Sequence, residues 1–236
     1  MGCVSRWAGL AHGEPRVKPS VVAVLFDLDG TLVDSAPDLA GTANDMRVAR
    51  GLPPLPYESL RRHAGTGARG MLGAAFGLAP GQPGFADLRT EFLHLYEQRM
   101  LRTSAPFDGA AALLRTLTAR ALPWGIVTNK ALYLAKPMAH AMLSLAPAVL
   151  VAGDCTPHVK PHPEPLLEAA RRLVVPPRAC VYVGDDHRDI VAGRAAGMAT
   201  LAATWGYLGP ESDPRTWGAD ALLSHPDALL NWLDMA

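Results

Sequence analysis

Asp27-Leu28-Asp29-Gly30-Thr31 follows directly on the apolar run Val21-Val22-Ala23-Val24-Leu25-Phe26. The run predicts a buried β-strand, and its end would direct the two carboxylates into one crevice. Gly30 permits a tight turn that brings backbone N–H groups near an anion. Asp-x-Asp alone is a weak signal, whereas Asp-x-Asp-Gly-Thr after a strand strongly favours a phosphoryl-transfer site.

The composition predicts a folded protein. The chain has 236 residues, 49% hydrophobic and 19% charged, so it is long enough for one or two domains. Lys and Arg together number 22, as do Asp and Glu, which argues against a nucleic-acid partner. No stretch approaches the roughly 20 apolar residues of a membrane span, so no membrane partner is expected.

The cysteines and the N-terminal residues bear on the cellular location of the protein. Cys3, Cys155 and Cys180 show no disulfide or metal spacing, which fits a reducing cytoplasm. Residues 1–20 lack the apolar segment of a secretory signal and are expected to form a loose extension.

Short apolar runs alternate with helical patterns along the rest of the chain. Strands are predicted at residues 21–26, 124–127, 149–152, 180–183, 199–203 and 219–223. Helices are predicted at residues 109–120, 131–145, 163–173, 188–196 and 227–234. This alternation predicts an α/β fold, with a Rossmann-like parallel sheet covered on both faces.

One segment breaks the alternation and is predicted to be entirely helical. Apolar residues at helical spacing occur within residues 85–100, and Ser35 is a candidate N-cap for the first helix. We therefore expect an inserted helical cap at residues 36–104. The catalytic core would comprise residues 21–35 and 105–236.

Chemically active side chains follow four of the predicted strands. They are Asp27 with Asp29, then Thr128 with Asn129, then Lys160, and finally the group Asp185, Asp186 and Asp189. Ligands of doubly wound sheets bind outside the carboxyl ends of the strands, so these groups are expected to meet in one crevice.

This set of motifs resembles the haloacid dehalogenase superfamily, specifically its phosphatases with a helical cap. The resemblance extends from Val21 to the C-terminus. It implies that Asp27 is the nucleophile and forms an aspartyl-phosphate. Asp29 would protonate the leaving group and then activate water as a base.

The resemblance also implies a magnesium site and a phosphate site. Asp27, the main-chain carbonyl of Asp29, and Asp185 would bind Mg²⁺, which prefers oxygen ligands. Thr128, Asn129 and Lys160 would hold the phosphoryl group, with Thr128 and Lys160 neutralising the charge that develops. Asp186 and Asp189 would support these groups.

Each of these motifs also has a purely structural interpretation. Asp27 and Asp29 could belong to an ordinary turn at the end of a strand. Thr128 could cap the following helix, and Lys160 could be a solvated surface lysine. Asp185, Asp186 and Asp189 could be acidic residues favoured at a helix N-terminus. His158, His162 and His187 flank the motifs without zinc-ligand spacing and are interpreted as surface or supporting residues.

Substrate choice is expected to reside in the cap. Residues 65–70, Gly-Thr-Gly-Ala-Arg-Gly, could present backbone donors and Arg69 to a carboxylate or phosphate. The alternative is a helix-entry loop with a surface arginine. Outside the catalytic motifs, the chain looks most similar to bacterial N-acetylmuramic acid 6-phosphate phosphatases, with phosphoglycolate phosphatases as the alternative.

The expected partner is therefore a small phosphorylated metabolite, bound by a monomer or a homodimer. A hexose-phosphate mutase and a non-catalytic phosphate-binding module are more distant alternatives. The intact set Asp27, Asp29, Thr128, Lys160 and Asp185 argues against the module. Asp29 and Asp185 argue against a dehalogenase, which needs neither.

Overall fold

The computed structural model describes residues 20–209 and 212–235. The predicted N-terminal extension lies outside the described residues, apart from Ser20. The central sheet is parallel, with the strand order β5-β4-β1-β6-β7-β8. Its strands are β1 (Ala23–Phe26), β4 (Trp124–Val127), β5 (Val149–Val151), β6 (Cys180–Gly184), β7 (Ala199–Ala203) and β8 (Ala221–Leu223).

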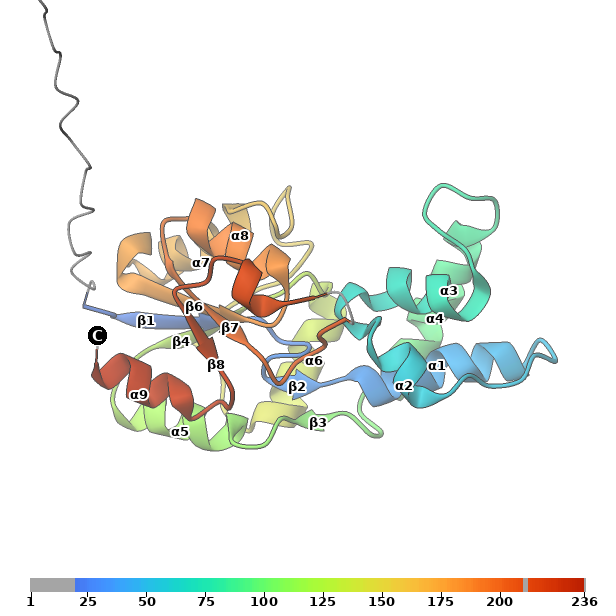
Figure 1. The fold of residues 1–236 in the computed structure, drawn as a ribbon, viewed down its shortest axis with the longest axis horizontal. Coiled ribbons are helices and arrows are strands. Elements are labelled where there is room, and N and C mark those ends of the chain that lie inside the picture. The colour runs from blue at the N-terminus through green and yellow to red at the C-terminus, as the bar shows by residue number, and fades with distance from the viewer. Residues whose placement is uncertain (1–19, 210–211, 236) are drawn as a thin grey trace, which may run out of the picture.

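Both faces of the sheet are apolar, as the nearly continuous hydrophobic strands require. Val24 and Phe26 belong to one buried cluster, with side chains of α5 (Ala110–Ala119), α6 (Leu132–Leu143) and α9 (Ala228–Asp234). Ala23 and Leu25 point to the other face, against α7 (Glu164–Leu173) and α8 (His187–Ala195). Figure 1 shows α5 and α9 on one side of the sheet and α7 and α8 on the other.

A helical insertion lies beside the sheet (Figure 1, right). It comprises α1 (Ala36–Val48), α2 (Tyr57–Arg61), the 3-10 turn η1 (Ala64–Thr66), α3 (Gly67–Phe76) and α4 (Phe85–Arg99). The first helix contacts both α3 and α4, and Met46, Met71 and Phe92 are fully buried in the insertion's interior. The predicted fold class, a parallel sheet with an inserted helical cap, is confirmed, while the boundaries at residues 36 and 104 stay a prediction.

The two chain segments between sheet and cap are held side by side. They pair as the antiparallel strands β2 (Val33–Asp34) and β3 (Ala105–Pro106). Nearby, the buried Asp38 carboxylate accepts hydrogen bonds from the main-chain N–H and hydroxyl groups of Thr103 and Ser104, at 2.6–3.0 Å. These hydrogen bonds link the chain segment that enters the cap to the segment that leaves it.

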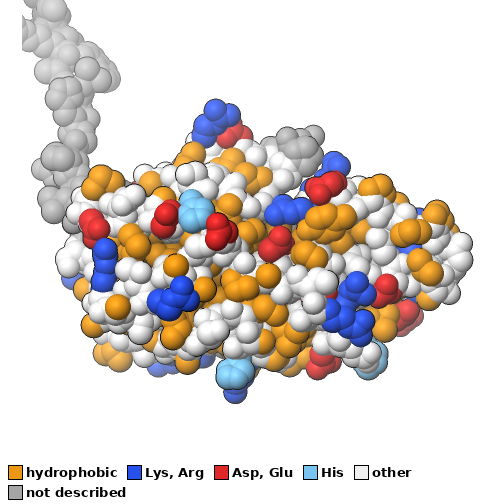
Figure 2. Space-filling model, turned by 90° about the horizontal axis from the view of Figure 1, so that it is seen from below, with side chains coloured by type: hydrophobic (Ala, Val, Ile, Leu, Met, Phe, Trp, Pro, Cys, Tyr) orange, Lys and Arg blue, Asp and Glu red, His pale blue; other side chains and the backbone are white. Residues whose placement is uncertain are grey.

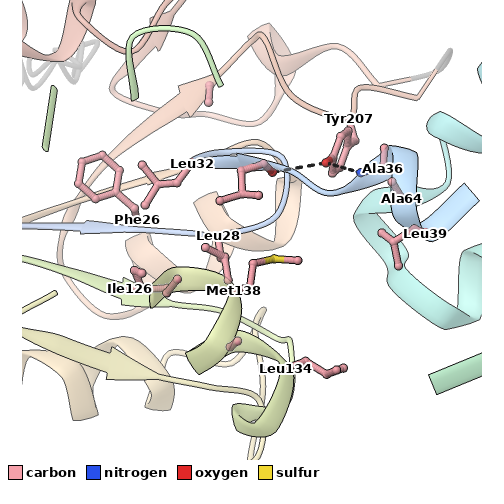
Figure 3. Packing of buried hydrophobic residues seen from close by; sticks show 14 of the residues in the cluster. Phe26, Leu28, Leu32, Ala36, Leu39, Ala64, Ile126, Leu134, Met138 and Tyr207 are labelled. Atoms are coloured by element: carbon pink, nitrogen blue, oxygen red, sulfur yellow. Dashed lines mark hydrogen bonds between the residues drawn. The ribbon is translucent and has the colours of Figure 1, made fainter. Parts of the chain in front are cut away.

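Tyr207, which follows β7 in the sheet domain, binds the same chain segment where it enters the cap. Its hydroxyl accepts hydrogen bonds from the N–H groups of Ser35 at 2.6 Å and Ala36 at 3.0 Å, and donates to Asp34 Oδ1 at 2.9 Å. Figure 3 shows this contact beside Leu39 and Ala64 of the cap. Ser35 occupies the N-cap position of α1, as predicted, but makes no side-chain capping bond; its hydroxyl donates to Asp29 instead.

Charged side chains are scattered over the face of the described chain that Figure 2 shows, with both signs interspersed. Among the described residues, no helix combines the length and apolar character needed to cross a membrane. Two further 3-10 turns, η2 (Pro177–Ala179) and η3 (Pro214–Thr216), complete the regular elements.

Candidate active site

Lys160 and two carboxylates form the centre of the site. The Asp27 N–H donates to Val183 O at 2.9 Å, which continues the pairing of β1 with β6 and holds Asp27 at the sheet edge. Lys160 Nζ lies 2.9 Å from Asp27 Oδ1 and 2.7 Å from Asp189 Oδ1. It also donates to Tyr182 Oη at 2.8 Å. The ammonium group is buried, so its attraction to both acids is weakly screened.

Asp185 lies beside this centre in a close-fitting cradle. Its carboxylate accepts hydrogen bonds from Thr31 Oγ1 at 3.0 Å and from the Tyr207 N–H at 2.8 Å. Gly30, at φ +87°, and Gly206 press against it so closely that a Cβ atom on either would collide with the carboxylate. Glycine is therefore required at both positions.

The carboxylates of Asp27, Asp185 and Asp189 could hold a cation, since one oxygen of each lies within 4.8 Å of the others. Burial raises the pKa of Asp27 to about 6, although Lys160 opposes the shift. Burial, followed by the charges of Asp27 and Asp189, raises the pKa of Asp185 well above its usual value. The three carboxylates outnumber the one ammonium group, which pairs with Asp27 and Asp189, so the donor set suits a hard divalent cation.

Asp29 contacts a residue that sequence reasoning missed. Lys130 Nζ lies 2.9 Å from Asp29 Oδ1 and donates to Tyr96 Oη of α4, also at 2.9 Å. Burial lowers the pKa of Lys130, but Asp29 and Tyr96 together outweigh burial and raise that pKa above its usual value. The position of Lys130, immediately after Thr128-Asn129 at a strand end, is the signal that could have revealed it.

Thr128 and Asn129 follow β4, where the sequence predicts them. Thr128 is buried, and its Oγ1 accepts a hydrogen bond from the Lys130 N–H at 3.2 Å. The amide of Asn129 donates to Lys160 O and accepts from the Lys160 N–H, both at 2.9 Å. Its contacts within the chain therefore fix the Lys160 loop.

Asp186 and Asp189 form a capping box at the start of α8. Asp186 also binds the Arg188 guanidinium, with Oδ1 2.8 Å from Nε. Arg188 Nη2 reaches across to the main-chain oxygen of Gly65 in the cap, at 2.7 Å. Asp186 thus has the structural role that the sequence left open for it, and it also orients a contact between core and cap.

A cavity of about 600 Å³ opens between the sheet edge and the cap. Its lining includes the predicted residues Asp27, Asp29, Thr128, Asn129, Lys160, Asp186, Asp189 and Arg69. The cap contributes Arg89, Phe92, Leu93 and Tyr96 from α4. Asp185 adjoins the cavity through Asp27 and Asp189. The structure therefore brings all the predicted site residues to one place.

The flanking histidines lie outside this centre. His158 and His162 are exposed and stack at 4.2 Å between ring centroids, and His158 Nδ1 lies 2.6 Å from Glu164 Oε2. His187 is also exposed, and its ring tilts against Trp217. None of the three histidines lines the cavity that contains Asp27.

Residues 21–197 match the family model of haloacid dehalogenase-like hydrolases. The chain belongs to that family. A predicted phosphoglycolate phosphatase from Haemophilus somnus shares the fold, with a TM-score of 0.80 at 24% identity over 90% of this chain and 98% of that one. At that identity the likeness establishes the fold alone.

Relatives of higher identity carry phosphatase names. The N-acetylmuramic acid 6-phosphate phosphatase of Pseudomonas aeruginosa is 43% identical over 91% of this chain and 95% of its own length. A phosphoglycolate phosphatase of Xanthomonas campestris is 47% identical over 88% of this chain and 94% of its own length. The predicted enzyme class, a phosphoric monoester hydrolase, is confirmed.

Proposed function

We propose that this chain is a Mg²⁺-dependent phosphatase that hydrolyses a small phosphorylated metabolite through an aspartyl-phosphate on Asp27. The observation that carries the proposal is Lys160 Nζ, which lies within 3 Å of both Asp27 and Asp189 in the carboxylate cluster. A buried ammonium group beside a nucleophilic acid attracts a phosphate and stabilises the charge that develops on it.

The first half-reaction transfers the phosphoryl group to the protein. A carboxylate oxygen of Asp27 attacks phosphorus while the bond from phosphorus to the ester oxygen breaks. Asp29 gives its proton to the departing alkoxide. Lys160 and Thr128 hold the phosphoryl oxygens, and Asn129 positions Lys160 through its main chain.

The second half-reaction releases phosphate. Asp29, now ionised, takes a proton from water as the water oxygen attacks phosphorus and the bond from Asp27 to phosphorus breaks. Lys130 holds the Asp29 carboxylate in place through its ion pair. Mg²⁺, held by Asp27, Asp185 and the main-chain carbonyl of Asp29, would offset the repulsion between the anionic nucleophile and the phosphate.

The substrate we favour is N-acetylmuramic acid 6-phosphate, as named for the Pseudomonas aeruginosa relative. The cavity of about 600 Å³ has room for an acylated sugar phosphate. Phosphoglycolate is the second candidate, supported by the name of the Xanthomonas campestris relative. A cytoplasmic location and the choice between monomer and homodimer stay predictions.

Phosphate release tests this proposal. N-acetylmuramic acid 6-phosphate and 2-phosphoglycolate are offered separately at equal concentrations with Mg²⁺, and again with EDTA. We expect release that EDTA abolishes and a higher kcat/KM for the sugar phosphate. A higher kcat/KM for phosphoglycolate would make phosphoglycolate the favoured substrate. The absence of metal-dependent release from both compounds would contradict the proposed function.

A further inference from the structure

Two cap arginines face the cavity without a protein partner. Arg69 near the start of α3 and Arg89 on α4 both line it, and both are exposed. Within the described residues, neither makes a hydrogen bond or an ion pair. By contrast, Arg50 of the same cap binds Glu91, and Arg99 binds Asp45. The two guanidinium groups are thus available to a ligand.

Arg89 belongs to a stripe of α4 that faces the cavity. Arg89, Phe92, Leu93 and Tyr96 all line it, at the spacing of one helical face. Tyr96 Oη is at the catalytic end of the stripe, because it binds Lys130 and Lys130 binds Asp29. Arg89 is two turns earlier, about 10 Å along the helix axis. Its Cα–Cβ bond tilts toward the helix N-terminus, away from Tyr96.

The wall between the two ends is apolar. Phe92 and Leu93 lie between Arg89 and Tyr96 on α4, and Leu39 and Leu134 line the cavity as well. Such a wall suits the carbon face of a sugar ring or an acyl methyl group, while charged groups of the ligand are best held at the two ends.

We propose that Arg69 and Arg89 form a second anion subsite for a carboxylate that a sugar-sized spacer separates from the scissile phosphate. This inference rests on the proposed function and narrows its substrate class to phosphorylated sugar acids. A guanidinium group binds a carboxylate through paired, charge-assisted hydrogen bonds. Arginines from two different helices would also link the ligand to a fixed arrangement of α3 and α4.

The separation of the two sites favours the larger candidate substrate. In phosphoglycolate three bonds join phosphorus to the carboxyl carbon, a span of at most about 4 Å. In N-acetylmuramic acid 6-phosphate eight bonds across the ring separate them, a span of roughly 8 Å. The longer span of the second ligand suits a phosphate at Asp27 and a carboxylate near Arg89, two turns along the α4 stripe.

Two sugar phosphates that differ only in the carboxylate-bearing group test the subsite. N-acetylmuramic acid 6-phosphate carries a lactyl ether that N-acetylglucosamine 6-phosphate lacks. We expect kcat/KM to favour the first by about 10–100-fold, the range that charge-assisted hydrogen bonds supply. Arg69→Ala and Arg89→Ala should each reduce this ratio, mainly through KM, and the double variant should bring it close to one. Arg115→Ala, an exposed arginine on α5, should keep the wild-type ratio.

Equal kcat/KM for the two sugars in the wild type, or an unchanged ratio in both variants, would overturn the subsite. If the enzyme releases phosphate from neither sugar, N-acetylmuramic acid 6-phosphate is not its substrate, and the subsite is judged by binding instead. Calorimetry on Asp27→Asn, with and without Arg89→Ala, should then show tighter binding of N-acetylmuramic acid 6-phosphate that Arg89→Ala removes. Equal binding of both sugars to Asp27→Asn would overturn the subsite independently.

Discussion

Lys130 Nζ lies 2.9 Å from Asp29 Oδ1, so the proposed acid–base residue is ion-paired with a buried lysine. The same ammonium group binds the hydroxyl of Tyr96 in the cap. The position of Asp29 therefore depends on an element of the sheet domain and on one of the cap. A cap held in this arrangement would complete the surroundings of the acid–base group, while an open cap would lose the Tyr96 contact.

Replacement of this lysine should impair both catalysis and stability. Lys130→Ala leaves Asp29 without its cation, so we expect kcat to fall by about 10–100-fold because proton transfer loses its positioned group. The free energy of unfolding should fall by about 2–4 kcal/mol, since a partly buried charge becomes unpaired. Steady-state kinetics and urea denaturation measure the two effects. Lys136→Ala, an exposed lysine on α6, serves as the control; equal behaviour of the two variants would refute the role of Lys130.

Removal of the nucleophile should abolish turnover without unfolding the protein. Asp27→Asn keeps the shape of the side chain but cannot form the aspartyl-phosphate, so kcat should drop by at least about 10³-fold. Its melting temperature should stay within a few degrees of the wild type. Asp87→Asn, an exposed residue of α4, should retain full activity. Turnover by Asp27→Asn near the wild-type rate would remove Asp27 from the mechanism.

The hydrogen bonds that the Asp38 carboxylate makes between the start and the end of the cap should weaken at acidic pH. Burial would raise the pKa of Asp38, but the hydrogen bonds from Thr103 and Ser104 outweigh it and hold the pKa below the usual 3.8. A depressed pKa stabilises the fold above the unfolded-state value, and the contribution is lost as pH falls through the folded-state value.

Asp38→Asn should therefore lower the free energy of unfolding by about 2–4 kcal/mol at neutral pH. The difference from wild type should shrink as the pH falls below about 4. Urea denaturation across this pH range measures it, with the exposed Glu97→Gln of α4 as the reference. A difference that is constant with pH would show that the ionised carboxylate is not the source of the stabilisation.

The Tyr207 hydroxyl should stabilise the entry to the cap. Tyr207→Phe leaves the Ser35 N–H without its acceptor and leaves the Ala36 N–H with only its 3.2 Å contact to Asp34 Oδ1, which should cost about 1–3 kcal/mol of unfolding free energy. Hydrogen exchange at those two amides should accelerate in the variant. Unchanged protection of both amides would show that another acceptor replaces the hydroxyl.

The arrangement of the sheet could be predicted because local patterns encode it. Strands at Trp124–Val127 and Ala199–Ala203 occur with the predicted bounds, since buried parallel strands are recognisable apolar runs. The strand-end motifs likewise predict that Asp27, Lys160 and Asp185 meet, because a parallel sheet brings the carboxyl ends of its strands together.

Contacts between cap and core could not be predicted in this way. The position of Lys130 after Thr128-Asn129 is visible in the sequence, but only the placement of α4 shows that Tyr96 reaches it. Arg89 looks like a surface residue of an amphipathic helix until the cavity beneath it is known. The hydroxyl of Ser35, expected to cap α1, binds Asp29 because the bridge between Asp29 and Val33 brings this part of the chain back beside Asp29.

Chemical trapping of the intermediate tests the central claim most directly. The enzyme is mixed with substrate and Mg²⁺, quenched during turnover, reduced with borohydride and analysed by peptide mass spectrometry. An acyl phosphate on Asp27 is reduced to the alcohol, so the account predicts homoserine at position 27 only when substrate and Mg²⁺ are both present. An unmodified Asp27 during rapid turnover, or modification at a different carboxylate, would contradict it.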